Sequence, residues 1–200
     1  MTSKVAPEFR GTFGHFTNRW RPRAAIGVFA LASLAAGAYA VAAAELEAWT
    51  GGAKPALVLD RLDGPRTDLE TWRGQVVLVH FFATWCEPCI AETAALNRLA
   101  ERHSGKPFTI LAVDVGEIDA RVRTFARENE VAFPILLDRD KSAMKAWQVE
   151  GLPTSFVLDA DHVPVFAAGG DVAWDDPQID ARLNSLIAQT GTRDAPAASN

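Results

Sequence analysis

The feature that most constrains this chain is a pair of cysteines that directly follows a strongly apolar run. Residues 76–82 read VVLVHFF, and a continuous run of β-branched and aromatic residues is typical of a strand buried on both faces. The hexapeptide TWCEPC follows at residues 84–89, and helical spacing begins at Cys86. Because the first turn of a helix brings such a pair together, this C-x-x-C predicts a redox-active dithiol at a strand-to-helix junction.

The two cysteines are expected to have different roles. Cys86 would begin the helix, where free backbone N–H groups and the helix dipole stabilise a thiolate. We therefore expect Cys86 to be the exposed nucleophile and Cys89 the recessed resolving thiol. Pro88 lacks an N–H, which costs nothing near a helix start. The charge of Glu87 disfavours the Cys86 thiolate and so favours a low reduction potential, that of a reductant. We expect Trp85 to cover the sulfurs as a lid, with a core position as the alternative.

Other uses of two cysteines remain open. A structural disulfide closing so small a loop adds little stability, and a tetrahedral zinc site lacks two further cysteines. A Cu(I) carrier that uses Cys86, Cys89 and a histidine is the alternative from a different class, because soft thiolates suit Cu(I). The only methionines are Met1 and Met144, and no histidine closely follows the motif. A peroxidase of the peroxiredoxin type is disfavoured, because Thr84 is one residue off the T-x-x-C spacing.

Charge and hydropathy divide the chain into a leader and a body. Residues 24–44 are 21 consecutive uncharged positions, enough to span a bilayer as a helix. The preceding residues 1–23 hold five basic residues and one acid, so they are expected to stay in the cytoplasm. We expect an uncleaved single-pass anchor, with a cleaved signal peptide or a buried helix as alternatives. The body would then lie in the periplasm or outside the cell.

The body carries a net charge of −9, since the whole chain has −5 and the first 44 residues have +4. Such an acidic surface argues against nucleic acid as a partner. Residues 45–55, with Gly51, Gly52 and Pro55, read as a linker. Residues 56–189 are expected to form the domain, and residues 190–200 a flexible tail.

Within the domain, strand-like and helix-like segments alternate. Strands are expected at 56–60, 76–82, 108–115, 135–137, 155–158 and 163–167, and helices at 86–103, 119–130, 141–147 and 177–189. The buried face of the first helix is expected to hold Ile90, Ala94, Leu96 and Leu99. This order predicts an α/β fold, with a central mixed β-sheet flanked by helices and preceded by the transmembrane or signal helix.

Two motifs together resemble a known family. WCEPC after residues 76–82, and GLPT at residues 151–154 before the strand at 155–158, look like the thioredoxin fold. They resemble in particular the TlpA/ResA group of exported, membrane-anchored thiol-disulfide oxidoreductases, over roughly residues 55–188. Residues 118–138 look like the extra helix–strand insertion of this group. The chain departs from the pattern at His80, where thioredoxin has a buried Asp, and at Phe82, where many relatives have Trp.

The resemblance implies further site residues. Pro153 is expected to follow a cis peptide bond, so that Leu152, Pro153 and Thr154 form a substrate-binding segment beside the dithiol. Glu92 matches the group's glutamate below the dithiol. It lies one helical turn after Cys89, and partial burial would raise its pKa and suit it to proton transfer.

The other conspicuous residues are assigned more modest roles. His80 is read as a buried core histidine, with a proton relay as the alternative. His162 is expected to be solvated in a hairpin turn, and Trp174 to serve packing. The resemblance implies protein substrates, such as the cysteine pair of apocytochrome c or a copper-site protein, and a membrane electron donor that restores the dithiol. No metal and no cofactor beyond the Cys86–Cys89 disulfide are expected.

Overall fold

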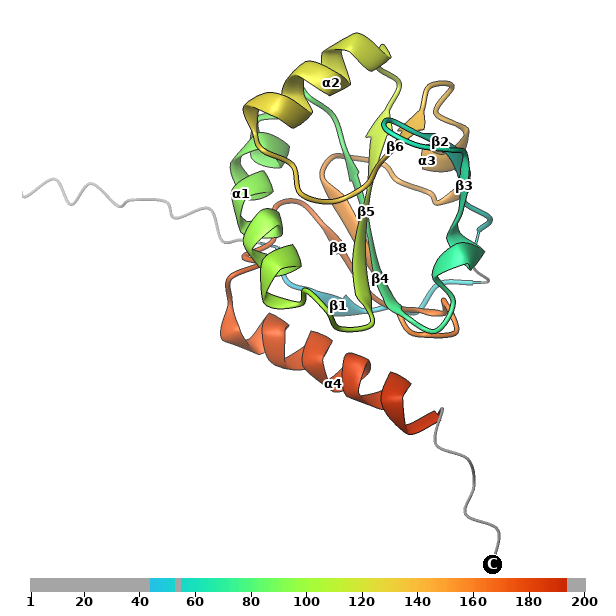
Figure 1. The fold of residues 1–200 in the computed structure, drawn as a ribbon, viewed down its shortest axis with the longest axis vertical. Coiled ribbons are helices and arrows are strands. Elements are labelled where there is room, and N and C mark those ends of the chain that lie inside the picture. Colours follow the sequence, from blue (N-terminus) through green and yellow to red (C-terminus); the bar gives the residue numbers. More distant parts are fainter. Residues whose placement is uncertain (1–43, 53–54, 194–200) are drawn as a thin grey trace, which may run out of the picture. The chain divides into compact units, whose positions relative to one another are not determined.

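The apolar run at residues 76–82 forms β4 (Val76–Phe82), whose seven residues are all buried. Figure 1 shows the computed structural model, which describes residues 44–52 and 55–193. Within these residues, eight strands form one sheet in the order β1-β8-β7-β4-β5-β6-β2-β3, so that β4 is central. The remaining strands are β1 (Glu47–Ala48), β2 (Val58–Arg61), β3 (Thr67–Asp68), β5 (Phe108–Val115), β6 (Ile135–Asp138), β7 (Thr154–Leu158) and β8 (Pro164–Gly169).

The sheet is mixed, as the sequence predicted. β4, β5 and β6 run parallel, whereas β7 is antiparallel to β4 and β8 is antiparallel to β7. The outer strands β1, β2 and β3 add antiparallel pairs. In this register Phe82 lies opposite Asp114, and Phe81 lies opposite Thr154. The carboxyl ends of the central strands β4 and β5 therefore lie beside the start of β7, at the same end of the strands. This arrangement positions the site described below.

Helices cover both faces of the sheet (Figure 1). They are α1 (Glu87–Arg102), α2 (Asp119–Glu128), α3 (Ser142–Ala146) and α4 (Pro177–Arg193), with a 3-10 turn, η1, at Leu69–Trp72. α1 and α4 share a core with one face of β4 and β5, and α2 packs beside α1. α3 and η1 pack on the opposite face. The helix–strand unit predicted over residues 118–138 corresponds to α2 and β6.

The predicted buried face of α1 is wrong in part. Leu96 and Leu99 are buried, but Ala94 is exposed and Ile90 keeps 40% of its surface accessible. The buried stripe instead includes two polar side chains, and its members are Cys89, Glu92, Thr93, Leu96 and Leu99. A pattern that counts only apolar residues overlooks a buried glutamate, and so it predicts the wrong face of the helix as the buried one.

The predicted linker and tail are also shorter than expected. Within residues 45–55, Leu46 is 3% exposed and Glu47–Ala48 forms β1 on the edge of β8. Pairing with an open strand edge satisfies backbone groups, and the core accepts the Leu46 side chain, so this part is not a linker. At the other end, α4 continues to Arg193, and Thr190 is buried rather than part of a free tail.

Of the predicted membrane or signal segment 24–44, only Ala44 lies within the described residues, where its N–H donates to Asp171 O at 2.7 Å. The basic segment 1–23 lies outside them. None of the helices in the described part of the chain is long and apolar enough to cross a bilayer.

Candidate active site

The two cysteines lie at the start of α1 and form a disulfide, with their Cα atoms 5.2 Å apart. Cys86 is the N-cap of the helix, and the Cys89 N–H donates to Cys86 Sγ at 3.3 Å. Pro88 occupies the first turn, where no N–H is needed. The Cys89 N–H and the helix dipole thus favour negative charge on Cys86 Sγ once the disulfide is reduced.

Both cysteines are shielded from water. Cys86 is 5% exposed and Cys89 is 1% exposed, so Cys86 is the less buried of the two but not an exposed residue. Trp85, by contrast, keeps 65% of its surface accessible, which excludes a core position. Ile90 and Ile118 are also exposed apolar side chains, at 40% and 71%. In the sequence, Trp85 precedes Cys86 and Ile90 follows Cys89. Ile118 follows Glu117.

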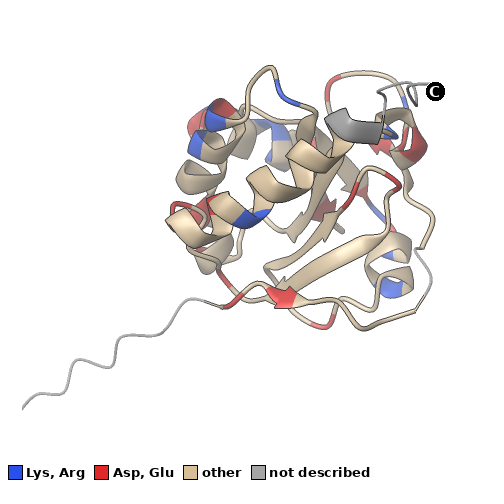
Figure 2. Ribbon diagram, turned by 90° about the horizontal axis from the view of Figure 1, so that it is seen from below, with Lys and Arg blue, Asp and Glu red and all other residues tan. Residues whose placement is uncertain are grey.

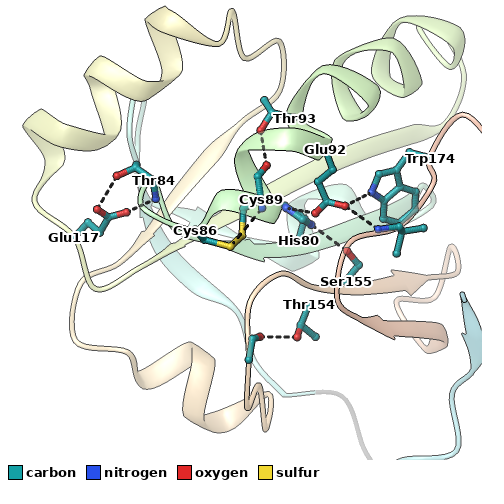
Figure 3. Close-up of a disulfide and its surroundings, with 12 residues drawn as sticks. His80, Thr84, Cys86, Cys89, Glu92, Thr93, Glu117, Thr154, Ser155 and Trp174 are labelled. Carbon is teal, nitrogen blue, oxygen red and sulfur yellow. Dashed lines mark hydrogen bonds and ion pairs between the residues drawn. A yellow bond between two sulfur atoms is a disulfide. The ribbon is translucent and has the colours of Figure 1, made fainter. Parts of the chain in front are cut away.

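Glu92 projects from α1 into the interior, one turn after Cys89 (Figure 3). It is 5% exposed, and its Oε2 accepts the Val172 N–H and the Trp174 Nε1–H, both at 3.0 Å. Burial raises the pKa of Glu92 to about 7, although the two donors oppose this shift. Near neutral pH the carboxyl therefore exists in both protonation states, as a group that transfers protons must.

His80 lies beside Glu92 on β4 and is 2% exposed. Its Nε2 is 3.3 Å from Glu92 Oε1, and its Nδ1 is 3.0 Å from Ser155 Oγ on β7. Burial lowers the pKa of His80 to about 3, so the ring is neutral at physiological pH. The residue is a buried histidine, as predicted, and it also contacts the carboxyl group.

The donors around Glu92 decide where its proton resides. Oε2 already accepts two N–H groups, so the proton of the neutral carboxyl belongs on Oε1, which faces His80 Nε2. In that state His80 Nδ1 carries the ring proton and donates to Ser155 Oγ. When Glu92 ionises, the ring can change tautomer, because the Ser155 hydroxyl both donates and accepts. Glu92, His80 and Ser155 thus form one hydrogen-bonded chain.

Trp174 holds Glu92 in place, a role that the sequence did not indicate. Its side chain is fully buried and its Nε1–H is directed at the carboxylate. It is 82 residues from Glu92 in the chain, so no local pattern connects the two. His162 also differs from expectation, since it is completely buried rather than solvated.

The segment containing Pro153 has the expected backbone form, because the Leu152–Pro153 peptide bond is cis. Thr154 begins β7 and donates its hydroxyl to Gly151 O at 2.8 Å. Figure 3 shows Thr154 on the strand that faces the disulfide. Leu152 packs against the core cluster that contains both cysteines.

A second pair of carboxyl groups lies near Cys86, and the sequence reasoning missed it. Glu117 accepts the Thr84 N–H through Oε2 at 2.6 Å and the Thr84 hydroxyl through Oε1 at 2.8 Å (Figure 3). Asp114, at the end of β5, is completely buried, and its carboxyl group lies against Glu117. Burial, and then the neighbouring Glu117 carboxyl, raise the pKa of Asp114 to about 8.

Glu87 points outward at the start of α1 and is exposed, unlike the carboxyl groups below it. In Figure 2 the acidic residues (red) and basic residues (blue) are scattered over helices, strands and loops rather than gathered in one basic patch. Across the residues that the structure describes, no three His, Cys, Asp or Glu side chains are arranged to hold a metal ion.

A C-x-x-C at the N-terminus of a helix, on a central mixed sheet with a cis-proline segment alongside, defines a thioredoxin-like protein. Solved structures of the same fold agree. A thiol:disulfide interchange protein of the thioredoxin family from Chlorobium tepidum matches with a TM-score of 0.60 at 22% identity, over 68% of this chain and 99% of its own. StoA from Bacillus subtilis matches with a TM-score of 0.56 at 23% identity, over 65% and 98%.

The chain belongs to the AhpC/TSA family, whose sequence model matches residues 50–164. It is ResA-like within the thioredoxin superfamily. The thiol-disulfide oxidoreductase ResA of Geobacillus thermodenitrificans is 38% identical over 109 residues, 54% of this chain and 63% of that protein. ResA of Bacillus thuringiensis subsp. konkukian is 33% identical over 111 residues, 56% and 64%. The chain thus matches somewhat less than two thirds of the length of these relatives.

Proposed function

We propose that this protein is a thiol-disulfide oxidoreductase that reduces disulfides of other proteins outside the cytoplasm. The observation that carries the proposal is the Cys86–Cys89 disulfide at the N-terminus of α1, one helical turn before a buried carboxyl group whose pKa is about 7. A structural disulfide needs no titratable group at its base. A dithiol that exchanges with substrates moves protons as well as electrons, and a neighbouring carboxyl group with a pKa near 7 can carry them.

The chemistry follows from the two sulfur positions. The Cys86 thiolate attacks a substrate disulfide, one substrate sulfur leaves as a thiol after taking up a proton, and a mixed disulfide forms. Cys89 then gives its proton to Glu92 and attacks Cys86 Sγ. The second substrate sulfur leaves as a thiolate and takes up a proton from solvent, so the substrate has gained two electrons and two protons, and the enzyme holds the Cys86–Cys89 disulfide. Glu92 passes its proton on through His80 or to solvent.

The surface around the dithiol suits a protein substrate. The side chains of Trp85, Ile90 and Ile118 are exposed and apolar, and they can bind apolar residues that flank a substrate cysteine. Leu152, Pro153 and Thr154 would bind the substrate backbone as an added strand. The exposed charge of Glu87 disfavours the Cys86 thiolate and so biases the dithiol toward reduction of its substrates.

Substrates and location follow from the resemblance to the TlpA/ResA group. We propose the cysteine pair of apocytochrome c, or the cysteines of a copper-site protein, as physiological targets. Residues 24–44 would anchor the protein in the cytoplasmic membrane, with residues 1–23 in the cytoplasm and a membrane electron donor re-reducing the disulfide. A reporter fused after Asn200 should be active only outside the cytoplasm, and the protein should stay in the membrane fraction. A soluble product that starts near Val41 or Glu45 would contradict the anchor.

Trapping of mixed disulfides tests the activity itself. Cys89→Ser should accumulate covalent complexes through Cys86, because the resolving step is blocked, whereas Cys86→Ser should form none. The wild-type protein should reduce insulin disulfides, and both variants should lose turnover. Complexes formed by Cys86→Ser in place of Cys89→Ser would reverse the two roles. A wild-type protein without insulin reductase activity would overturn the proposed function.

A further inference from the structure

The segment that leads from β4 to the dithiol is held by a side chain from another element. Thr84 is two residues before Cys86, and both of its donors, the N–H and the hydroxyl, bind the Glu117 carboxylate at 2.6 and 2.8 Å. Glu117 lies between β5 and α2, 33 residues further along the chain. Hydrogen bonds to an ionised acceptor are shorter and stronger than neutral ones, so this two-point contact is a firm one.

The contact bears directly on the position of the nucleophile. The Cys86 N–H donates to Ala83 O at 3.2 Å, so residues 83–86 form a tight turn with Thr84 inside it. Cys86 then caps α1. Moving Thr84 would therefore move the turn that sets Cys86 at the helix N-terminus.

Asp114 makes this contact unusual, because it places a second, completely buried carboxyl group against Glu117. Both the carboxyl group and the backbone N–H of Glu117 lie within hydrogen-bonding reach of Asp114. The chain reverses between the two acids at Gly116, whose φ of +75° favours glycine, and whose missing Cβ leaves room for the Lys141 side chain. Two adjacent buried carboxyl groups cannot both ionise without mutual repulsion.

The surroundings decide which of the two acids carries the proton. Glu117 accepts two donors from Thr84 and lies 3.6 Å from Arg121 Nη1, whereas Asp114 is completely buried and forms no ion pair with a described residue. Negative charge therefore belongs on Glu117 and the proton on Asp114. Of the charged groups nearby, Asp119 at the start of α2 adds negative charge beside Asp114, the Lys141 side chain lies over Gly116, and Arg139 pairs with Asp119.

We propose that Glu117 is a positioning residue that fixes the approach to Cys86 through Thr84, and that its buried neighbour Asp114 makes this hold depend on pH. While Asp114 is neutral, the Glu117 carboxylate keeps both Thr84 bonds. When Asp114 ionises in alkaline solution, a second negative charge opposes the Glu117 carboxylate, the hold on Thr84 weakens, and the Cys86 thiolate is disfavoured. The inference deepens the proposed dithiol function and rests on it.

The test is the alkylation rate of Cys86 in the reduced full-length protein between pH 6 and 10, with the modified cysteine identified by mass spectrometry. Asp114→Asn keeps the shape of the neutral acid and cannot ionise. It should raise the ratio of the alkylation rate at pH 9 to that at pH 7 by about three- to tenfold over wild type. A factor of this size corresponds to the net free energy of about one hydrogen bond. Glu128→Gln, an exposed carboxyl at the end of α2, is the matched control and should leave the ratio as in wild type.

Two substitutions at Thr84 test the hold itself. Thr84→Val removes the hydroxyl donor with little change of shape, and it should lower the Cys86 alkylation rate at pH 7 by about three- to tenfold. Thr84→Ser keeps the donor and should restore the wild-type rate and pH profile. Equal rates for the Val and Ser variants would overturn the positioning role, and a wild-type ratio in Asp114→Asn would overturn the pH dependence. Insulin reduction by the wild type, measured separately, reports on the proposed function, so the two failures are distinguishable.

Discussion

Two pairs of buried titratable side chains flank the disulfide. In one pair a carboxyl group lies next to a histidine, and in the other a carboxyl group lies next to a second acid. On the Cys89 side, Glu92 meets His80 and accepts N–H groups from Val172 and Trp174. On the Cys86 side, Asp114 meets another acid, Glu117 (Figure 3 shows Glu92 and Glu117 on opposite sides of the sulfurs). Burial raises the carboxyl pKa in both cases.

The partner determines what such a carboxyl group can do. A histidine can take up a proton at one nitrogen and release it at the other, so Glu92 can exchange its proton with a group beyond it. A second carboxylate offers no such path in the ionised state, and two acids that share a site hold one proton firmly. We therefore assign proton transfer to the pair near Cys89 and positioning to the pair near Cys86.

The largest expected effect is on the pH dependence of stability. The raised pKa of Glu92 favours the folded protein below pH 4.5, and this contribution is lost as the pH rises to about 7. Relative to wild type, Glu92→Gln should gain stability over this range by roughly 1.4 kcal/mol per pH unit, or about 3 kcal/mol in total. Chemical denaturation at several pH values measures this difference.

Two variants extend this measurement to the comparison. Relative to wild type, Asp114→Asn should also become more stable as the pH rises from 3.8 toward 8, because the pKa of the buried Asp114 is raised in the folded protein. The pKa of His80 is lowered from 6.5 to about 3, so its contribution is lost as the pH falls through that range. His80→Asn should therefore gain stability in acid, opposite to the carboxyl variants. Parallel curves for Glu92→Gln and wild type would show that Glu92 has an ordinary pKa.

The second prediction concerns the rate of thiol exchange. Glu92→Gln keeps the shape of the side chain but removes the exchangeable proton, so insulin reduction should slow by up to about 10²-fold. The inflection near pH 7 in the rate profile should disappear with it. Glu101→Gln, an exposed carboxyl on the same helix, is the matched control and should behave as wild type. An unchanged rate and profile in Glu92→Gln would remove the proton-transfer role.

The third prediction concerns the donors that hold Glu92. Trp174→Phe keeps a large ring in a fully buried position but removes the Nε1–H. Loss of a hydrogen bond to the ionised form should raise the pKa of Glu92 further, and leaving the carboxylate short of a donor should cost about 1–3 kcal/mol of stability. The rate profile should shift its inflection to higher pH rather than lose it. A profile identical to that of wild type would mean that Val172 alone holds the carboxylate.

The two sides of the disulfide also differ in how far the sequence could predict them. The strand, the C-x-x-C and Glu92 are close together in the chain, so periodicity and helical spacing located them. The partners of Glu92 are not local, since Trp174 is 82 residues away and Ser155 is 75 residues from His80. Asp114 and Glu117 gave no signal, because a buried acid and an exposed one look the same in a sequence.

The same limit explains the errors in the fold. Ile90 was expected in the core because it is apolar, yet the buried stripe of α1 follows Cys89, Glu92 and Thr93. Residues 45–48 were read as linker because β1 is only two residues long and depends on the edge of β8. Strand pairing and buried polar contacts are tertiary properties, and local composition does not report them.

The smallest expected effect is at Glu87, an exposed carboxyl next to Cys86 that shares the charge of the buried acids but not their surroundings. Water screens its charge, so Glu87→Gln should raise the reduction potential of the dithiol by only on the order of 10 mV, through a slightly more stable Cys86 thiolate. Equilibration with glutathione buffers measures the potential, and raising the salt concentration should remove most of the difference. If Glu87→Gln changed the exchange rate as much as Glu92→Gln, proximity to the sulfurs rather than burial would control the chemistry, and the distinction between the two buried pairs would lose its basis.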